Sequence, residues 1–120
     1  MQKVQGIGGV FFRSKNPEAL ADWYRQHLGV DPVPTSYDAL PWQQEAGFTV
    51  FAPFPDDTAY FPAERQWMIN FRVADLDAMV AQLRSADIEV TTDDQPQPNG
   101  RFARLHDPEQ NPIELWEPAG

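Results

Sequence analysis

The sequence repeats one pattern twice: a strand, an amphipathic helix and three short strands. At an offset of 59 residues, four positions in the first strand and helix of the two halves are identical, and the polar residues that begin the two predicted helices also coincide. The identical pairs are Phe12 and Phe71, Arg13 and Arg72, Ala19 and Ala78, and Arg25 and Arg84. Because the order of elements repeats together with these residues, we interpret the chain as an internal duplication. A duplication of this size predicts two small halves that share one core.

The first half begins with residues 1–13, a segment rich in β-branched and aromatic residues that predicts a strand. A helix is predicted to follow, because Asn16 is a suitable N-cap, Pro17 fits the first helical position and Gly29 suits a left-handed end. Six of the twelve prolines fall between residues 30 and 63, which excludes a long helix there. This spacing predicts short strands at Thr35–Asp38, Pro41–Glu45 and Gly47–Phe54.

The second half repeats this order. The segment Gln66–Val73 predicts a strand, and Asp75 is the expected N-cap of a second helix. The apolar residues of that helix fall on one face: Leu76, Met79, Val80 and Leu83. Three short strands are then predicted at Ile88–Thr92, Arg101–His106 and Ile113–Glu117.

The charge and length of the chain indicate which kind of protein it is and exclude some classes of partner. Nine lysines and arginines against eighteen aspartates and glutamates leave a net charge of -9. Such a field repels phosphate backbones and anionic lipids, so we expect neither nucleic acid nor a membrane as a partner. Cysteine is absent, which excludes a disulfide framework and a zinc–sulfur site. With 120 residues and no long apolar stretch, the chain is expected to be one cytoplasmic globular domain, 1–120.

Two motifs carry a resemblance to a known superfamily. Residues Trp23–Gly29 read WYRQHLG, similar to FYxxxLG, and Asp107–Leu115 read DPEQNPIEL, similar to DPxGNxIEL. Together with the duplicated unit, these motifs resemble the vicinal oxygen chelate superfamily, which includes glyoxalase I, bleomycin-resistance proteins and extradiol dioxygenases. The resemblance implies an α+β fold in which tandem βαβββ repeats, about 1–62 and 63–120, form a curved, partly open, eight-stranded barrel-like sheet with two helices outside.

Two positions depart from the pattern of the superfamily. Gln110 stands where the superfamily usually has glycine, so this turn is expected to need a different backbone geometry. Asp87 replaces the usual glycine after the second helix, and aspartate tolerates the left-handed region better than most residues. Neither departure is expected to prevent the fold.

The resemblance also implies four metal-ligand positions, two in each repeat. In this sequence they match Gly9, the neighbourhood of Val50, Met68 and Glu114. Only Glu114 has a donor that suits a hard divalent cation, and one carboxylate does not make a high-affinity site. We therefore expect no metal and no other cofactor.

Strand alternation predicts which side chains face a common cavity. If the ligand positions implied by the resemblance face inward, alternate residues of each strand share that face. The residues so placed are Phe11, Arg13, Asn70, Arg72, Glu114 and Trp116. If Ala103 and Leu105 belong to the core, the same alternation adds Phe102, Arg104 and His106. Arginine suits a carboxylate or phosphate group, and aromatic walls suit a flat or apolar body. Arg13 also occupies the place of an arginine with which glyoxalase-like relatives hold a substrate carboxylate.

The sequence leaves three hypotheses open. The first is a metal-independent small-molecule-binding protein of the glyoxalase/bleomycin-resistance type, whose ligand has an anionic or polar group and an aromatic or apolar body. If this protein is an enzyme, Glu114 is the candidate general base and His106 the alternative. The second hypothesis is a divalent-metal lyase or dioxygenase that uses Glu114, His106 and Glu45. The third is a non-catalytic interaction domain with a filled barrel, in which Arg13 or Arg72 simply pairs with Glu114.

A homodimer is expected, because proteins of this fold often pair through their sheets. Four aromatic residues suit either the mouth of the cavity or the seam of such a dimer: Trp42, Phe54, Tyr60 and Trp67.

Overall fold

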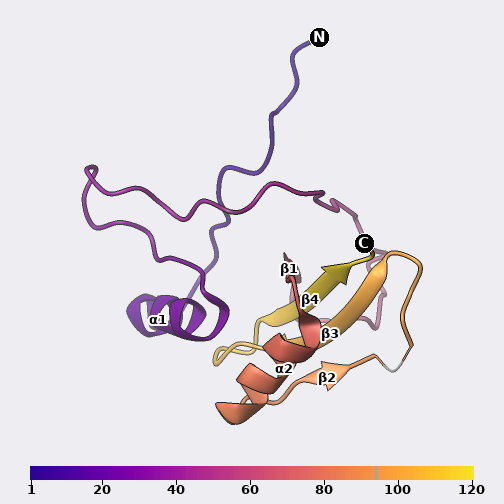
Figure 1. The fold of residues 1–120 in the computed structure, drawn as a ribbon. Helices are drawn as coiled ribbons and strands as arrows, with labels where there is room; N and C mark the ends of the chain where they lie inside the picture. The colour runs from indigo at the N-terminus through magenta and orange to yellow at the C-terminus, as the bar shows by residue number, and fades with distance from the viewer. Residues whose placement is uncertain (94) are drawn as a thin grey trace.

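The computed structural model describes residues 1–93 and 95–120, and its sheet lies entirely in the second half of the chain (Figure 1). The elements are helix α1 (Pro17–Leu28), strand β1 (Ile69–Arg72), helix α2 (Leu76–Ser85) and strands β2 (Thr91–Thr92), β3 (Gly100–His106) and β4 (Pro112–Pro118). The strands form one sheet in the order β1-β4-β3-β2, in which β1 runs parallel to β4 and the other neighbours are antiparallel. The predicted α+β class is confirmed. Neither helix of the described chain is long and apolar enough to span a membrane.

Helix α1 begins and ends where the sequence predicts. The side chain of Asn16 accepts a hydrogen bond from the N–H of Ala19 at 3.2 Å, which satisfies one of the free donors of the first turn. Gly29 adopts a left-handed φ of 73° and donates to the carbonyl of Arg25 at 3.2 Å. These caps fix the helix so that its buried Tyr24 reaches the sheet.

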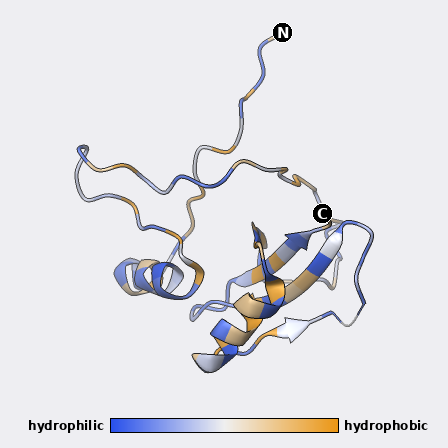
Figure 2. Cartoon of the chain, viewed as in Figure 1, coloured by the Kyte–Doolittle hydropathy of each residue, from blue (hydrophilic) through white to orange (hydrophobic). Residues whose placement is uncertain are grey.

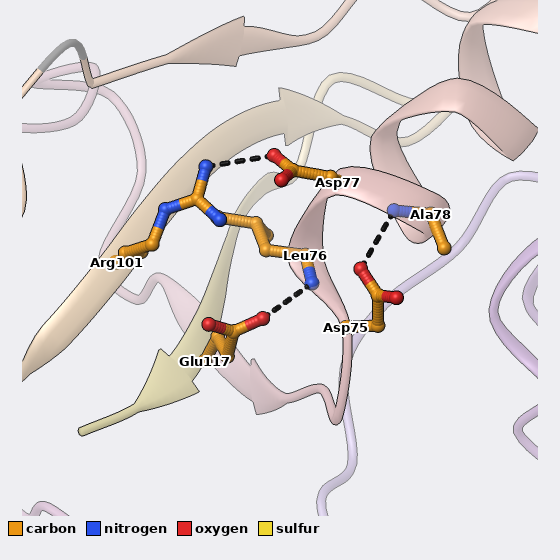
Figure 3. A network of polar contacts seen from close by, with 6 residues as sticks. All are labelled: Asp75, Leu76, Asp77, Ala78, Arg101 and Glu117. Atoms are coloured by element: carbon orange, nitrogen blue, oxygen red, sulfur yellow. Dashed lines mark hydrogen bonds and ion pairs between the residues drawn. The ribbon is translucent and has the colours of Figure 1, made fainter. Parts of the chain in front are cut away.

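A polar network ties the start of α2 to β3 and β4 (Figure 3). The carboxylate of Asp75 caps a backbone N–H of the first turn at 3.0 Å. On β4, Glu117 accepts from the N–H of Leu76 at 2.9 Å, and on β3, Arg101 pairs with Asp77 at 2.7 Å. Two strands therefore hold the N-terminal end of α2, where negative side chains also complement the helix dipole.

The core lies between the sheet and the two helices. Hydrophobic and hydrophilic residues alternate along β3 and β4 (Figure 2), so each strand turns one set of side chains toward the helices. The buried core residues are Leu20, Tyr24, Leu76, Val80, Leu83, Val90, Ala103, Leu105, Ile113 and Leu115. The opposite face of the sheet is therefore left to the polar and aromatic residues.

A buried carboxylate joins α1 to the turn between β3 and β4. Asp107 is 2% exposed, and its Oδ2 atom accepts from the Tyr24 hydroxyl at 2.7 Å and from the side-chain amide of Asn111 at 2.8 Å. Its Oδ1 atom accepts from the backbone N–H groups of Glu109 at 2.8 Å and Asn111 at 3.0 Å. Burial, with the bond to Asp107, raises the pKa of Tyr24 far above its usual value, so the phenol remains a donor. The two motifs that carry the resemblance thus contact each other directly.

The two departures from glycine both occupy left-handed positions. Asp87 has a φ of 61° and Gln110 a φ of 67°. Both positions therefore keep the backbone geometry that favours glycine. Because Asp87 and Gln110 have a Cβ atom, this geometry strains their backbone.

The first half differs from the prediction. Residues 1–13 and the segments Thr35–Asp38, Pro41–Glu45 and Gly47–Phe54 contain no strand, so the described chain has four of the eight strands expected. An apolar pattern favours an extended segment, but a strand forms only where a neighbour pairs with its backbone groups. These segments have no such neighbour, and Phe11 (96%) and Phe51 (78%) remain exposed. A single chain does not form the eight-stranded barrel in this structure.

Candidate functional site

The face of the sheet that turns away from the helices carries the candidate site. Along β4, Ile113 and Leu115 belong to the core, whereas Glu114 and Trp116 point to the opposite face. Glu114 is only 9% exposed, and a carboxylate that is buried to this degree needs hydrogen-bond donors around it. The arrangement around Glu114 shows how this burial is compensated.

Three side chains on neighbouring strands form what we call the polar row: Asn70, Glu114 and Arg104. The sheet register places Glu114 of β4 beside Asn70 of β1 and beside Arg104 of β3. The amide nitrogen Nδ2 of Asn70 donates to Oε1 of Glu114 at 2.7 Å. Side chains directly opposite on one face lie about 5 Å apart at their Cβ atoms, so the row presents donor, acceptor and cation together.

The phenol of Tyr60 covers the polar row. Its hydroxyl donates to Oε2 of Glu114, and its ring centre lies 5.0 Å from the Cζ atom of Arg104. Burial, reinforced by the hydrogen bond to Glu114, raises the pKa of Tyr60 far above its usual value, so the hydroxyl remains a donor. The Nε atom of Arg104 is buried and has no hydrogen-bond partner among the described residues. An unpaired donor of this kind is costly unless a ligand completes it.

A cavity of about 890 Å³ opens beside the polar row. One wall is the segment Thr58–Ala63, and the other runs from Thr91 over Arg104 to His106. Its volume lies within the range of small-molecule sites, and its lining mixes apolar side chains with a few polar ones. Met68, at one of the implied ligand positions, also lines it.

A second row, next to the first, consists of Arg72, Trp116 and Phe102. The Phe102 and Trp116 rings are parallel, with centres 6.3 Å apart. The guanidinium of Arg72 donates to the carbonyl of Glu45 at 2.7 Å and to that of Phe48. Arg72 therefore holds the segment around Gly47 against the sheet rather than pairing with Glu114.

The structure brings together most of the residues that the sequence placed in one cavity, but not all. Asn70, Arg104 and Glu114 form the polar row, and His106 lies exposed at the end of the cavity. Phe11 and Arg13 lie elsewhere, because residues 1–13 do not join the sheet. Arg13 lines a different cavity, and the pairing of Arg13 and Arg72 at one hollow is not present.

The sequence placed Tyr60 at the mouth of the cavity or in a dimer seam, but it did not predict the contact of Tyr60 with Glu114. Tyr60 comes from an irregular segment with no hydrophobic period, so strand alternation does not predict where its side chain points. The available signal was indirect: a buried Glu114 requires hydrogen-bond donors, and the end of the first half offers a phenol.

The contacts of Glu114 determine what it can do chemically. Both carboxylate oxygens already accept a hydrogen bond, one from Tyr60 and one from Asn70. A general base must instead reach a proton on the substrate. Glu114 therefore orients Tyr60 and Asn70 in this arrangement, and Tyr60 covers the oxygen to which it donates.

The donors on this face do not fit a divalent cation. Residues 1–93 and 95–120 contain no group of three His, Cys, Asp or Glu side chains placed to hold a metal ion. Around Glu114 the neighbours are an amide donor, a guanidinium and a protonated phenol. A hard cation needs several oxygen ligands, and positive or donor groups oppose it.

Comparison with known proteins gives the family. Residues 9–116 match the model of the glyoxalase-like domain family. No curated protein matches the chain.

Three solved structures are similar to this chain. The glyoxylase/bleomycin resistance protein/dioxygenase domain from Frankia sp. EAN1pec is 18% identical over 98% of this chain and 100% of its own, with a TM-score of 0.60. TnmS3, an antibiotic binding protein from Streptomyces sp. CB03234, is 24% identical over 88% of each chain, with a TM-score of 0.51. These two likenesses bear on the fold alone. A glyoxalase/bleomycin resistance protein from the same Streptomyces is 30% identical over 43% of this chain, with a TM-score of 0.39, and this chain spans only 46% of its length.

Proposed function

The chain belongs to the glyoxalase-like domain family, and from this premise we propose that it binds a small molecule over the polar row of its sheet. The ligand has a planar aromatic or apolar body and an anionic or polar group. The observation that carries this proposal is the position of Tyr60, whose ring lies over Arg104 while its hydroxyl bonds Glu114. The chain's own phenol thus occupies the place of an aromatic ligand with a hydrogen-bond donor.

The polar row supplies both kinds of recognition. Arg104 offers a face for stacking and an unpartnered Nε for an anionic group. Glu114 accepts from a hydroxyl or amide of the ligand in place of Tyr60. A ligand that displaces Tyr60 gains the cavity of about 890 Å³ as well. Binding therefore exchanges one aromatic contact inside the protein for a similar contact with the ligand, and the anion adds to it.

The proposal is binding without a metal and without a chemical step. Support comes from the two hydrogen bonds that occupy Glu114 and from the cationic neighbour Arg104. Binding of a small molecule is also what the name of TnmS3, an antibiotic binding protein, describes for that protein. Elemental analysis of protein purified without chelator tests the metal part: stoichiometric zinc, iron, manganese or nickel would contradict it.

The same proposal includes a homodimer that completes the eight-stranded sheet. Support comes from the first half, where Phe11, Phe48 and Phe51 are 78–96% exposed in a single chain. A second copy that covers such residues removes apolar area from water. Size-exclusion chromatography with light scattering tests this part. One chain has a mass of 13.6 kDa, and we expect twice this mass. The mass of one chain at all concentrations would contradict the dimer.

A thermal-shift screen tests the ligand class. Aromatic acids, phenols and uncharged aromatic compounds are each added to the wild-type protein, and binding to the folded state raises Tm. We expect the aromatic acids to raise Tm most, because only they offer an anion to Arg104. The shift is expected to vanish in Arg104→Gln and to persist in Arg25→Gln, which removes the same charge from an exposed pair on α1. Equal shifts in both variants, or none with any aromatic compound, would contradict the proposal.

A further inference from the structure

We propose that the protein has a second site, separate from the polar row, that binds a small oxyanion carrying two or more negative charges. The site is a cavity of about 490 Å³ between the residues that precede α1 and the turn that joins β3 to β4. It goes beyond the proposed function, because neither Tyr60 nor any member of the polar row lines it.

The charge of this cavity is opposite to that of the protein. Arg13, Lys15 and Arg65 line it, and Glu109 is its one acidic residue. Three of the chain's nine lysines and arginines thus meet one of its eighteen carboxylates, in a protein of net charge -9. Cations gathered in a concave place raise the local potential and favour an anion there.

The one carboxylate in the cavity offsets only part of the positive charge of these cations. Glu109 accepts from the Ser14 hydroxyl at 2.6 Å and from the N–H of Lys15 at 2.8 Å, so its oxygens are held by the start of α1. These bonds, from Ser14 first, lower the pKa of Glu109, which keeps it ionised. Glu109 therefore bonds the segment that precedes α1, and the three cationic side chains exceed its single negative charge, which leaves a positive surplus for another anion.

None of the three cations has an ion pair within the described part of the chain, where the pairs are Arg25 with Asp22 and Arg101 with Asp77. The Nη2 atom of Arg65 donates to the backbone carbonyl of Glu109 at 3.0 Å, which fixes its guanidinium at the cavity wall.

The predicted ligand follows from this geometry. Three cations around one cavity give a surplus of positive charge that a single carboxylate matches poorly, whereas a diphosphate or a tricarboxylate matches it well. Arginine forks bind both phosphate and carboxylate oxygens, so the shared chemistry is a multivalent oxyanion. The experiment distinguishes phosphate anions from carboxylate anions.

The experiment titrates inorganic pyrophosphate, and separately citrate, into the full chain by calorimetry and by amide NMR. We expect at least one of them to bind and to shift the amides of Ser14, Lys15 and Asn111, with little change at Thr91 and His106. The tighter of the two anions identifies the class. Gln110 lines both cavities and is not used as a reporter.

Matched variants test whether the anion binds in this cavity or is only attracted to the cations of the protein in general. Arg13→Gln and Lys15→Gln, whose side chains make no hydrogen bond to residues 1–93 or 95–120, are each expected to weaken binding about tenfold, the effect of losing one charged contact. Arg65→Gln is expected to do the same, and Arg25→Gln to leave the Kd unchanged. No binding of either anion, or equal weakening in Arg25→Gln, would overturn the proposal. So would a loss of aromatic-acid binding in Arg13→Gln, because Arg13 would then belong to the first site.

Discussion

Replacing Asp107 with asparagine is expected to weaken the attachment of α1 to the sheet. In the wild-type protein, Oδ1 of Asp107 accepts from two backbone N–H groups, and Oδ2 accepts from the Tyr24 hydroxyl and the Asn111 side chain. The asparagine oxygen can keep the backbone pair. Its nitrogen then faces the Asn111 amide, another donor, and the Tyr24 hydroxyl loses its charged acceptor.

The magnitude follows from counting these bonds. A hydrogen bond to a charged group contributes about 1.5–3 kcal/mol, and the substitution removes two of them from a residue that is 2% exposed. The free energy of unfolding is therefore expected to fall by about 3–6 kcal/mol, a large part of the roughly 5–15 kcal/mol of a typical domain.

Urea denaturation of the wild-type protein and four variants measures this effect. Tyr24→Phe removes one of the two bonds and is expected to cost about 1.5–3 kcal/mol. The double variant should lose less than the sum of the two single losses, because the hydroxyl and the carboxylate act on each other. Asp31→Asn removes the same charge from an exposed position and should stay within about 0.5 kcal/mol of wild type. Asp107→Asn within about 1 kcal/mol of wild type, or strictly additive losses, would refute the reasoning.

Three further substitutions or conditions have defined outcomes. Gln110→Gly is expected to raise the free energy of unfolding by about 0.5 kcal/mol in urea, because glycine relieves the left-handed strain at φ 67° but also gains freedom when unfolded; a clear loss would count against it. Stability should fall as pH rises above about 10, because Tyr24 ionises there in the unfolded chain, whereas its raised pKa keeps it protonated in the folded protein. Tyr24→Phe should make this alkaline decline shallower, and an unchanged decline would be contrary. Glu117→Gln should cost about 0.5–1 kcal/mol and speed hydrogen exchange at the start of α2, because the N–H of Leu76 loses a charged acceptor; unchanged exchange would argue against that role.

Strand alternation explains why part of the site could be predicted from the sequence. In β4, the buried pair Ile113 and Leu115 determines that Glu114 turns the other way, and the antiparallel neighbour brings Arg104 beside it. The caps of both helices are equally local, because Asn16 and Asp75 each bond a backbone N–H three residues ahead. Such features depend on a few neighbouring residues, which a sequence displays directly.

Long-range pairing explains what could not be predicted. The segment that contains Phe11 and Arg13 has the composition of a strand, but composition does not say which edge it joins, and in this structure it joins none. Tyr60 reaches Glu114 from a segment without regular structure, across 54 positions of the chain. Arg72 matches Arg13 in the repeat but bonds the carbonyls of Glu45 and Phe48, which no repeat pattern indicates.

In our proposal, an aromatic anion displaces Tyr60 and binds across β1, β4 and β3. Titration of isotopically labelled protein with 4-hydroxybenzoate, followed by amide and tyrosine-ring NMR, tests this most directly. We expect the largest chemical-shift changes at Tyr60, Asn70 and Glu114, and we expect Arg104→Gln to remove them. Shifts that centre on the helices, or that persist unchanged in Arg104→Gln, would contradict it.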